Sequence, residues 1–77
     1  MAANQGALPS FICPISMALM TDPVTSCDGH TYQRSSIETW LRHRLSSPLT
    51  GALLPSDHLV PNLALRSAIQ EWQERHA

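Results

Sequence analysis

Two pairs of positions in this chain have the spacing of zinc ligands. Cys27 and His30 are separated by two residues, which is a common spacing for a metal-binding pair. Cys13 has no partner cysteine, because Ser16 occupies the matching position. A structural zinc site needs four ligands from cysteine, histidine or carboxylate. The spacing therefore favours a site whose metal ligands have been replaced. A small zinc-stabilised interaction domain that uses Cys27 and His30 is kept as an alternative.

Neither cysteine predicts covalent catalysis. A nucleophilic thiol requires a general base and a group that stabilises the oxyanion, and the sequence gives neither cysteine an obvious partner of this kind. Two cysteines also allow at most one disulfide, which is not the cysteine framework of a secreted protein. We therefore expect a reduced compartment, the cytoplasm or the nucleus.

The composition predicts one small globular domain. The chain has 77 residues, of which 43% are hydrophobic and 14% are charged. Its formal net charge of -1 leaves no basic excess that could bind phosphate backbones, so we expect no nucleic-acid partner. No apolar stretch approaches membrane-spanning length, so we expect no membrane segment.

Local patterns predict an α+β domain with the order loop, β-hairpin, helix, loop and helix. Residues 24–26 and 31–32 are β-favouring runs on either side of Asp28 and Gly29, a pair that suits a tight hairpin turn. We therefore expect a short hairpin in the first half of the chain.

The two helices have predicted starts. Ser35 lies three residues before Glu38, which matches the capping box of a central helix that we expect to fade between residues 43 and 45. Asn62 is a suitable N-cap for a C-terminal helix with an apolar stripe.

The remaining stretches are expected to be loops. Prolines interrupt residues 9–23 and 46–61, which favours two long ordered loops. Residues 1–8 lack periodicity and are expected to form a flexible lead-in to a domain that spans residues 9–77. The residues expected in the core are Leu19, Val24, Tyr32, Ile37, Leu41, Leu54, Leu59, Leu65 and Ile69.

Several short motifs occur in an order and spacing that resemble the U-box family. They are Phe-Ile-Cys-Pro-Ile-Ser, Leu-Met-Thr-Asp-Pro-Val, Asp-Gly-His-Thr-Tyr, Ser-Ile-Glu-x-Trp-Leu, Ser-Pro-Leu-Thr-Gly and Val-Pro-Asn-x-Ala-Leu. The resemblance runs from about residue 9 to residue 72. It implies a small RING-like fold in which hydrogen bonds and salt bridges take the place of zinc. We therefore expect no metal and no other cofactor.

The resemblance to a RING also assigns ligand-like positions. They are Cys13, Ser16, Gln33 and Ser36 at the first site, and Cys27, His30, Ser47 and Thr50 at the second. Hydroxyl and amide groups are poor zinc ligands but good hydrogen-bonding groups. The residues expected to brace the loops are Ser16, Asp22, Ser26, Asp28, Ser36 and Thr50. The alternative for each is an ordinary turn residue that makes one local hydrogen bond.

The resemblance implies a ubiquitin ligase module of the RING type. Such a module binds a ubiquitin-conjugating enzyme charged with ubiquitin and orients it for transfer to a substrate lysine, without a covalent intermediate of its own. We expect the substrate to be recruited by regions outside this chain. The residues expected to contact the conjugating enzyme are Ile15, Met17, Trp40, Pro48 and Leu49. The alternative is that Ile15, Trp40 and Leu49 belong to the core.

Gly51 departs from the pattern of many active family members. They carry a basic residue at this position that clamps ubiquitin against the conjugating enzyme, whereas glycine offers only its backbone. The alternative interpretation is therefore a U-box-like scaffold or dimerisation module without ligase activity. A homodimer is left open for the same reason.

Overall fold

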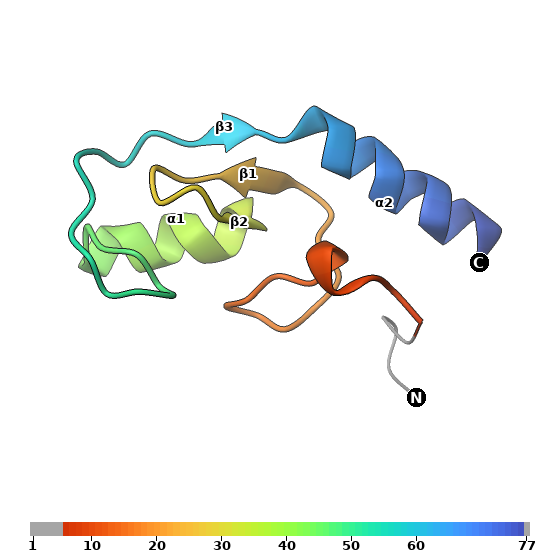
Figure 1. Ribbon diagram of the computed structural model, residues 1–77, viewed down its shortest axis with the longest axis horizontal. Helices are drawn as coiled ribbons and strands as arrows, with labels where there is room; N and C mark the ends of the chain where they lie inside the picture. The colour runs from red at the N-terminus through yellow and green to blue at the C-terminus, as the bar shows by residue number, and fades with distance from the viewer. Residues whose placement is uncertain (1–5, 77) are drawn as a thin grey trace.

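The computed structural model describes residues 6–76 and has the predicted α+β architecture. A small antiparallel sheet lies between two helices, with α1 beside the β1–β2 hairpin and α2 extending away from β3 (Figure 1). No helix within residues 6–76 is long and apolar enough to cross a membrane. The elements are the 3-10 helix η1 (Pro9–Phe11), β1 (Pro23–Thr25), β2 (Thr31–Gln33), α1 (Arg34–His43), β3 (Val60–Pro61) and α2 (Leu63–Arg75).

The predicted hairpin is confirmed. Strands β1 and β2 are antiparallel, with Val24 opposite Tyr32. Its turn is closed by two backbone hydrogen bonds, from the Ser26 amide to the His30 carbonyl and from the Gly29 amide to the Ser26 carbonyl, each 3.0 Å long. Gly29 has a φ of 83°, a conformation that glycine adopts without a steric penalty. The turn therefore depends on the Asp-Gly pair that the sequence indicated.

The third strand was not predicted. Residues 46–61 were expected to be a loop throughout, but Val60–Pro61 pairs with β1 and completes a sheet with the order β2-β1-β3. The Asn62 amide extends this pairing by donating to the Pro23 carbonyl at 2.9 Å. A proline is tolerated here because β3 lies at the edge of the sheet, where a missing amide donor breaks no ladder.

The expected capping box at the start of α1 is wrong. The helix begins at Arg34, its N-cap is Gln33 and no side chain caps it. Ser35 lies inside the first turn, where its carbonyl accepts from the Thr39 hydroxyl at 2.9 Å. The physical reason is that β2 continues directly into α1, so strand pairing fixes the start of the helix. Asp22 accepts from the Arg34 amide at 3.0 Å and so holds this start against the first loop.

The predicted cap of α2 is confirmed. The Asn62 side-chain oxygen accepts from the Leu65 amide at 3.1 Å. One face of the helix packs inward through Ile69, which is 1% exposed. Further along, the Trp72 ring meets the ring of Phe11 edge-on, with 6.4 Å between centroids, and so fixes α2 against η1.

The core is smaller than expected and contains a sulfur atom. Five of the residues assigned to it are buried, whereas Leu19, Leu41, Leu59 and Leu65 are only partly buried against it. A domain of this size leaves one side of many apolar residues facing solvent. Cys13 is fully buried, which its position in a proline-containing loop did not indicate. The buried hydrophobic residues are Phe11, Cys13, Met20, Val24, Tyr32, Ile37, Leu54 and Ile69.

The two helix starts should respond differently to alanine. We expect Asn62→Ala to lower the free energy of unfolding by about 0.5–2 kcal/mol, because the Leu65 amide loses its cap. Ser35→Ala should change it by less than about 0.5 kcal/mol, because the exposed Ser35 side chain caps nothing. Urea unfolding of both variants measures the difference. Equal losses would contradict the assignment of the caps.

Candidate partner-binding groove and its braces

The first loop is tied to the sheet through a cysteine. The Cys13 amide donates to the Ala18 carbonyl at 2.9 Å, and the Cys13 carbonyl accepts from the Met17 amide at 2.8 Å. The Cys13 sulfur accepts from the Gln33 amide at 3.3 Å, which joins the loop to the end of β2. A ligand-like sulfur thus connects the segments by a hydrogen bond.

The electrostatic environment of Cys13 favours its anion. Burial of the thiol opposes ionisation, but nearby backbone amides, those of Ser16 and Gln33 first, outweigh it and lower the pKa of Cys13 below its usual value. The side chain is nevertheless 0% exposed. A lowered pKa without access to solvent serves hydrogen bonding rather than reactivity.

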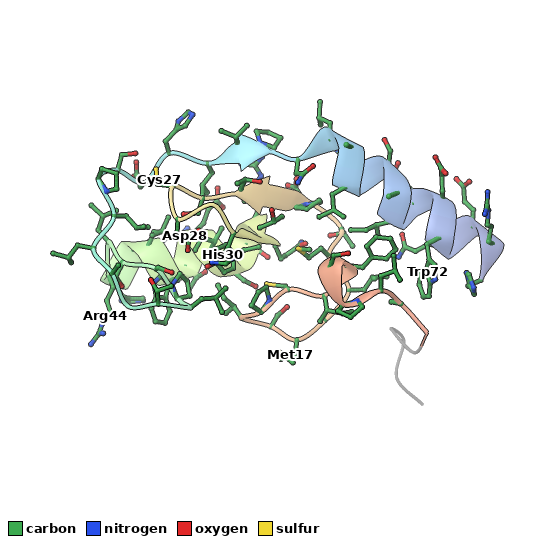
Figure 2. All side chains as sticks on the ribbon, viewed as in Figure 1. Met17, Cys27, Asp28, His30, Arg44 and Trp72 are labelled. Atoms are coloured by element: carbon green, nitrogen blue, oxygen red, sulfur yellow. The ribbon has the colours of Figure 1, made fainter. Side chains whose placement is uncertain are left out.

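The carboxylate of Asp28 holds the hairpin and the second loop together. One oxygen, Oδ2, accepts from the hydroxyls of Tyr32 and Ser47, each at 2.7 Å. The other, Oδ1, accepts from the His30 amide at 2.8 Å. Ser47 in turn accepts from the Leu49 and Thr50 amides at 3.2 and 3.1 Å. One side chain therefore reaches the turn, β2 and the second loop; Figure 2 shows it where these segments meet.

These bonds shift two pKa values in opposite directions. Burial of the Asp28 carboxyl opposes ionisation, but the donors Tyr32, His30 and Ser47 hold its pKa below the usual value of 3.8. Burial raises the pKa of Tyr32 well above its usual value, and its bond to Asp28 raises it further. At neutral pH the pair is therefore a carboxylate that accepts from a neutral phenol.

A third brace joins the first loop to α1. Asp22 accepts from Arg34 Nε at 2.8 Å. The Gln33 side-chain oxygen accepts from the Thr21 and Asp22 amides at 2.8 and 3.0 Å, and its Nε2 donates to the Thr21 hydroxyl at 2.9 Å. The ion pair is more than a third exposed, so solvent screening leaves it a small contribution. The amide bridge of Gln33 is the more specific connection.

The residues expected to brace the loops therefore divide into groups. Asp22 and Asp28 connect distant segments, as described above. Ser16 and Thr50 make local bonds, accepting from the Ala18 amide at 3.3 Å and the Ala52 amide at 3.2 Å. These two match the alternative of an ordinary turn residue. Ser36 instead lines the groove described below.

Ser26 is a correction. Its hydroxyl oxygen is buried and has no hydrogen-bond partner among residues 6–76. Ser26 contributes to the hairpin through its backbone instead, because its amide and carbonyl close the turn. Gln33 and Ser47 were assigned ligand-like positions but not a bracing role. Their ligand-like positions in the RING pattern were the only sequence feature from which this role could have been predicted.

A shallow apolar groove lies between the first loop and α1. It has a volume of about 300 Å³. Ile15 and Trp40 are its apolar residues, and both are partly exposed, so neither is simply core. Trp40 Nε1 donates to the Ser46 carbonyl at 2.8 Å, which fixes the indole plane and ties α1 to the second loop. The groove is lined by Ile15, Ser36, Thr39, Trp40, His43 and Arg44.

The other residues expected at this surface do not line the groove itself. Leu49 is 49% exposed and Pro48 half-buried, both in the second loop. Met17 is 68% exposed at the first loop, and its φ of 59° is unusual for a residue with a side chain. Exposure of Leu49 excludes the alternative that it belongs to the core. Met17, Pro48 and Leu49 are available to a partner that extends beyond the groove.

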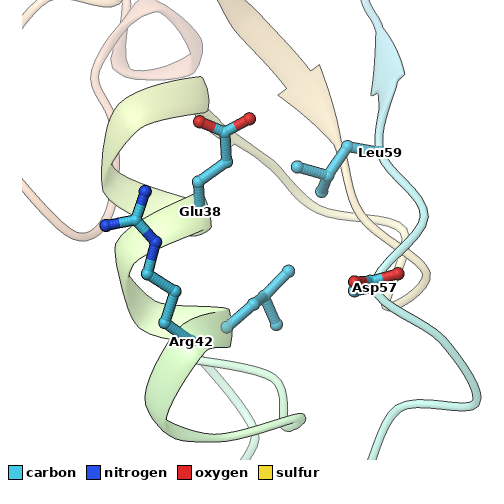
Figure 3. Close-up of a pocket in the computed structure, with 5 residues that line it drawn as sticks. Glu38, Arg42, Asp57 and Leu59 are labelled. Carbon is cyan, nitrogen blue, oxygen red and sulfur yellow. The ribbon is translucent and has the colours of Figure 1, made fainter.

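A second depression lies on the opposite side of α1 (Figure 3). It has a volume of about 390 Å³, and charged side chains surround its apolar base. Glu38 and Arg42 reach it from α1, and Asp57 and Leu59 from the segment before β3. This depression has no counterpart among the sequence expectations. Its polar rim makes it a weaker candidate for an apolar partner contact.

The positions of Cys27 and His30 do not assemble a metal site. Within residues 6–76, no group of three or more histidine, cysteine, aspartate or glutamate side chains is arranged to hold a metal ion. The Cys27 sulfur lies 3.3 Å from the Ser56 hydroxyl and donates to the His58 carbonyl at 3.8 Å. Its neighbours are therefore oxygen atoms of the chain leading to β3.

The Asp28 brace should carry measurable stability. We expect Asp28→Asn to lower the free energy of unfolding by about 1–3 kcal/mol, because hydrogen bonds to a charged acceptor are lost. Asp57→Asn is the matched control, since the Asp57 carboxylate is exposed and makes no hydrogen bond or ion pair within residues 6–76. Urea unfolding at pH 7 measures both. A loss in the control as large as in Asp28→Asn would exclude a specific brace.

The pH dependence has a defined sign. The pKa of Asp28 is lower in the folded protein than its usual value of 3.8, so its contribution is present above that value. It is lost as the pH falls through 3.8 and on through the lower folded pKa. The unfolding free energy of the Asp28→Asn variant should therefore fall less steeply below pH 4 than that of the unchanged chain. Parallel acid titrations would argue against this assignment.

Comparison with known proteins identifies a family for this chain. The family model of the U-box domain matches residues 8–77. The chain is 49% identical over 78 residues to U-box domain-containing protein 70 of Oryza sativa subsp. japonica, covering 99% of this chain and 10% of that protein. It is 56% identical over 64 residues to U-box domain-containing protein 37 of Arabidopsis thaliana, covering 80% and 16%. It is 42% identical over 74 residues to the human WD repeat, SAM and U-box domain-containing protein 1, covering 95% and 16%.

The matches confirm the resemblance seen in the sequence. The chain spans only 10% to 16% of the length of these three relatives, so each match concerns a part of the relative. U-box domains are in general ubiquitin ligase modules that work with ubiquitin-conjugating enzymes. With a family model that covers residues 8–77, and with the loops and groove in the arrangement described, the chain belongs to the U-box domain family.

Proposed function

We propose that the chain binds a ubiquitin-conjugating enzyme charged with ubiquitin and promotes transfer of ubiquitin to a substrate lysine. One observation carries the proposal: the apolar groove of Ile15 and Trp40, left partly open to solvent in a member of the U-box family. An aromatic and an aliphatic side chain on separate elements form the kind of site in which a few residues supply most of the binding energy. Pro48 and Leu49 extend this surface along the second loop.

The groove is suited to binding without rearrangement. Trp40 is held by its bond to the Ser46 carbonyl, and the loop that carries Ile15 is tied at Cys13. Side chains that are fixed before binding lose less conformational entropy when a partner arrives. The braces thus support the affinity of a small contact surface as well as the stability of the fold.

The chemistry assigned to the module is orientation. The substrate amine attacks the thioester carbonyl, a C–N bond forms, the C–S bond breaks, and the conjugating enzyme leaves as a thiol after the amine has lost a proton. No atom of the U-box forms a bond in this step. Cys13 is fully buried, and within residues 6–76 the exposed Cys27 thiol hydrogen-bonds to a hydroxyl and a carbonyl rather than to a base, so the proposal assigns neither thiol a nucleophilic role. Holding two reactants in a productive geometry accounts for the acceleration.

The chain matches only a part of each relative, which bears on how a substrate is recruited. The human relative carries WD repeat and SAM in its name beside the U-box. We propose that substrate recruitment in the present case also belongs to regions outside residues 1–77. A location in the cytoplasm or the nucleus and formation of a homodimer stay predictions.

A scaffold without ligase activity is the second candidate, and Gly51 favours it. Gly51 has a φ of 79° and its amide donates to the Ser47 carbonyl at 2.9 Å. The turn of the second loop therefore uses a backbone conformation that suits glycine, and a basic side chain at this position would be strained. The turn of the second loop therefore contains Gly51, which has no side chain that could clamp ubiquitin. Discharge assays separate this candidate from an active ligase.

Folding should not require zinc. The loops of the described residues are joined by Asp28, Gln33 and the Cys13 sulfur, so adding a chelator such as EDTA should leave the melting temperature unchanged. Elemental analysis of the purified protein should find far less than one zinc per chain. Stoichiometric zinc or unfolding in the chelator would overturn the proposal and restore the zinc-stabilised alternative.

The role of the groove in binding a conjugating enzyme can be tested by placing one charged side chain in it. We expect Ile15→Lys to leave thermal melting almost unchanged, because Ile15 is partly exposed, and to abolish ubiquitin discharge from a charged conjugating enzyme. Leu53→Lys is the control, since Leu53 is 87% exposed and lies outside the groove. It should melt and discharge normally. Unfolding of Ile15→Lys would assign Ile15 to the core, and normal discharge would remove the groove assignment.

A further inference from the structure

The groove has basic residues, His43 and Arg44, where it meets the C-terminal end of α1. Six residues line the groove, and His43 and Arg44 are the only ionisable ones among them. The chain as a whole has a formal net charge of -1, so this edge does not reflect an overall excess of bases. The depression on the other side of α1 is different, because Glu38 and Asp57 accompany Arg42 there. An apolar contact with a basic edge is thus specific to one side of the helix.

The backbone of Arg44 is held in place, whereas its guanidinium makes no ion pair with any residue from 6 to 76. Arg44 is the C-cap of α1, and its amide donates to the Trp40 carbonyl at 3.0 Å. Trp40 is the same residue whose indole is held by the second loop. Within residues 6–76 the ion pairs belong to Arg34, and the guanidinium of Arg44 makes none. Figure 2 shows the side chain extending outward from the end of α1.

We propose that Arg44 determines which conjugating enzymes the groove accepts. It favours enzymes that present an aspartate or glutamate beside the apolar contact, and it disfavours those that present a lysine or arginine there. A guanidinium can donate two parallel hydrogen bonds to one carboxylate, whereas it repels a cation at the same distance. This inference rests on the proposed function and adds a specificity-determining residue to it.

The proposal fits the location of the charge. An exposed charge at the edge of an apolar contact acts mainly on the association rate and on the choice of partner, and it contributes little to the stability of the free domain. Its effect weakens as the salt concentration rises, because the charges are screened over about 8–10 Å at physiological ionic strength. Salt dependence is therefore a signature that an apolar or purely structural role of Arg44 would lack.

Arg42, in the last turn of α1, and Arg44, its C-cap, provide a matched experiment. Arg44→Glu and Arg42→Glu make the same change in net charge at the end of the same helix, but Arg42 lines the opposite depression. The purified domain of each variant is first melted. Ubiquitin discharge is then measured with a panel of charged conjugating enzymes, at low and at high salt. Arg44→Gln, which removes the charge and keeps a long polar side chain, serves as the second variant if Arg44→Glu does not fold.

The expected result is specific to the partner. Arg44→Glu should slow discharge by about tenfold or more at low salt for some enzymes of the panel and speed it for others, while Arg42→Glu stays within about twofold of the unchanged domain. For a slowed enzyme, changing the acidic residue that faces Arg44 to lysine should restore discharge by Arg44→Glu. Arg44→Gln should weaken the preference without reversing it.

Other results would overturn the proposal in distinguishable ways. If Ile15→Lys abolishes discharge but Arg44→Glu leaves every enzyme unaffected, the proposed function stands and the inference is wrong. Equal effects of Arg42→Glu and Arg44→Glu across the panel would show a general charge effect and also exclude it. If the unchanged domain discharges no enzyme, or if Ile15→Lys has no effect, the proposed function fails and the inference fails with it.

Discussion

The carboxylate of Asp28 connects three parts of the chain that local structure alone would leave separate. It accepts from the hairpin turn through His30, from β2 through Tyr32 and from the second loop through Ser47. The second loop has no helix or strand between the end of α1 at His43 and β3 at Val60. Such a long loop needs a tertiary contact, because its own turns do not fix its position against the sheet. The charge strengthens each bond, since an ionised acceptor binds a donor more strongly than a neutral one. Asp28 therefore anchors the second loop to the hairpin, while the bond from Trp40 to the Ser46 carbonyl anchors the same loop to α1.

The groove depends on braces that lie outside it. Ile15 lies in a loop that the Cys13 sulfur ties to β2, and Trp40 lies in a helix whose start is held by Asp22. Gln33 takes part in both arrangements. Its side chain hydrogen-bonds to the first loop, and its backbone belongs to β2 of the sheet. The groove is therefore held by polar contacts of residues that do not line it.

The sequence indicated most of the fold because its strongest signals are local. The Asp-Gly turn, the Asn62 cap and the apolar stripes of both helices each act within a few residues. The failures have a common cause, which is that tertiary contacts decide the outcome. Ser35 has the right spacing for a cap, but the pairing of β2 sets where α1 begins. Val60 and Pro61 are too short a run to indicate a strand from sequence, and they pair with the free edge of β1. The family resemblance indicated Ile15 and Trp40 as contact residues, whereas Arg44 carries no signal of its own, because a helix end is an ordinary place for a basic residue.

The direct junction between β2 and α1 has a mechanical consequence. Gln33 is the last residue of the strand and Arg34 the first of the helix, so no linker can act as a hinge between sheet and helix. Tilting α1 would require breaking the pairs that Gln33 makes with Pro23 and the bond between Arg34 and Asp22. We therefore expect the helix and the hairpin to move as one rigid body. A displacement of α1 at Trp40 is therefore transmitted to the sheet, and through β3 to α2.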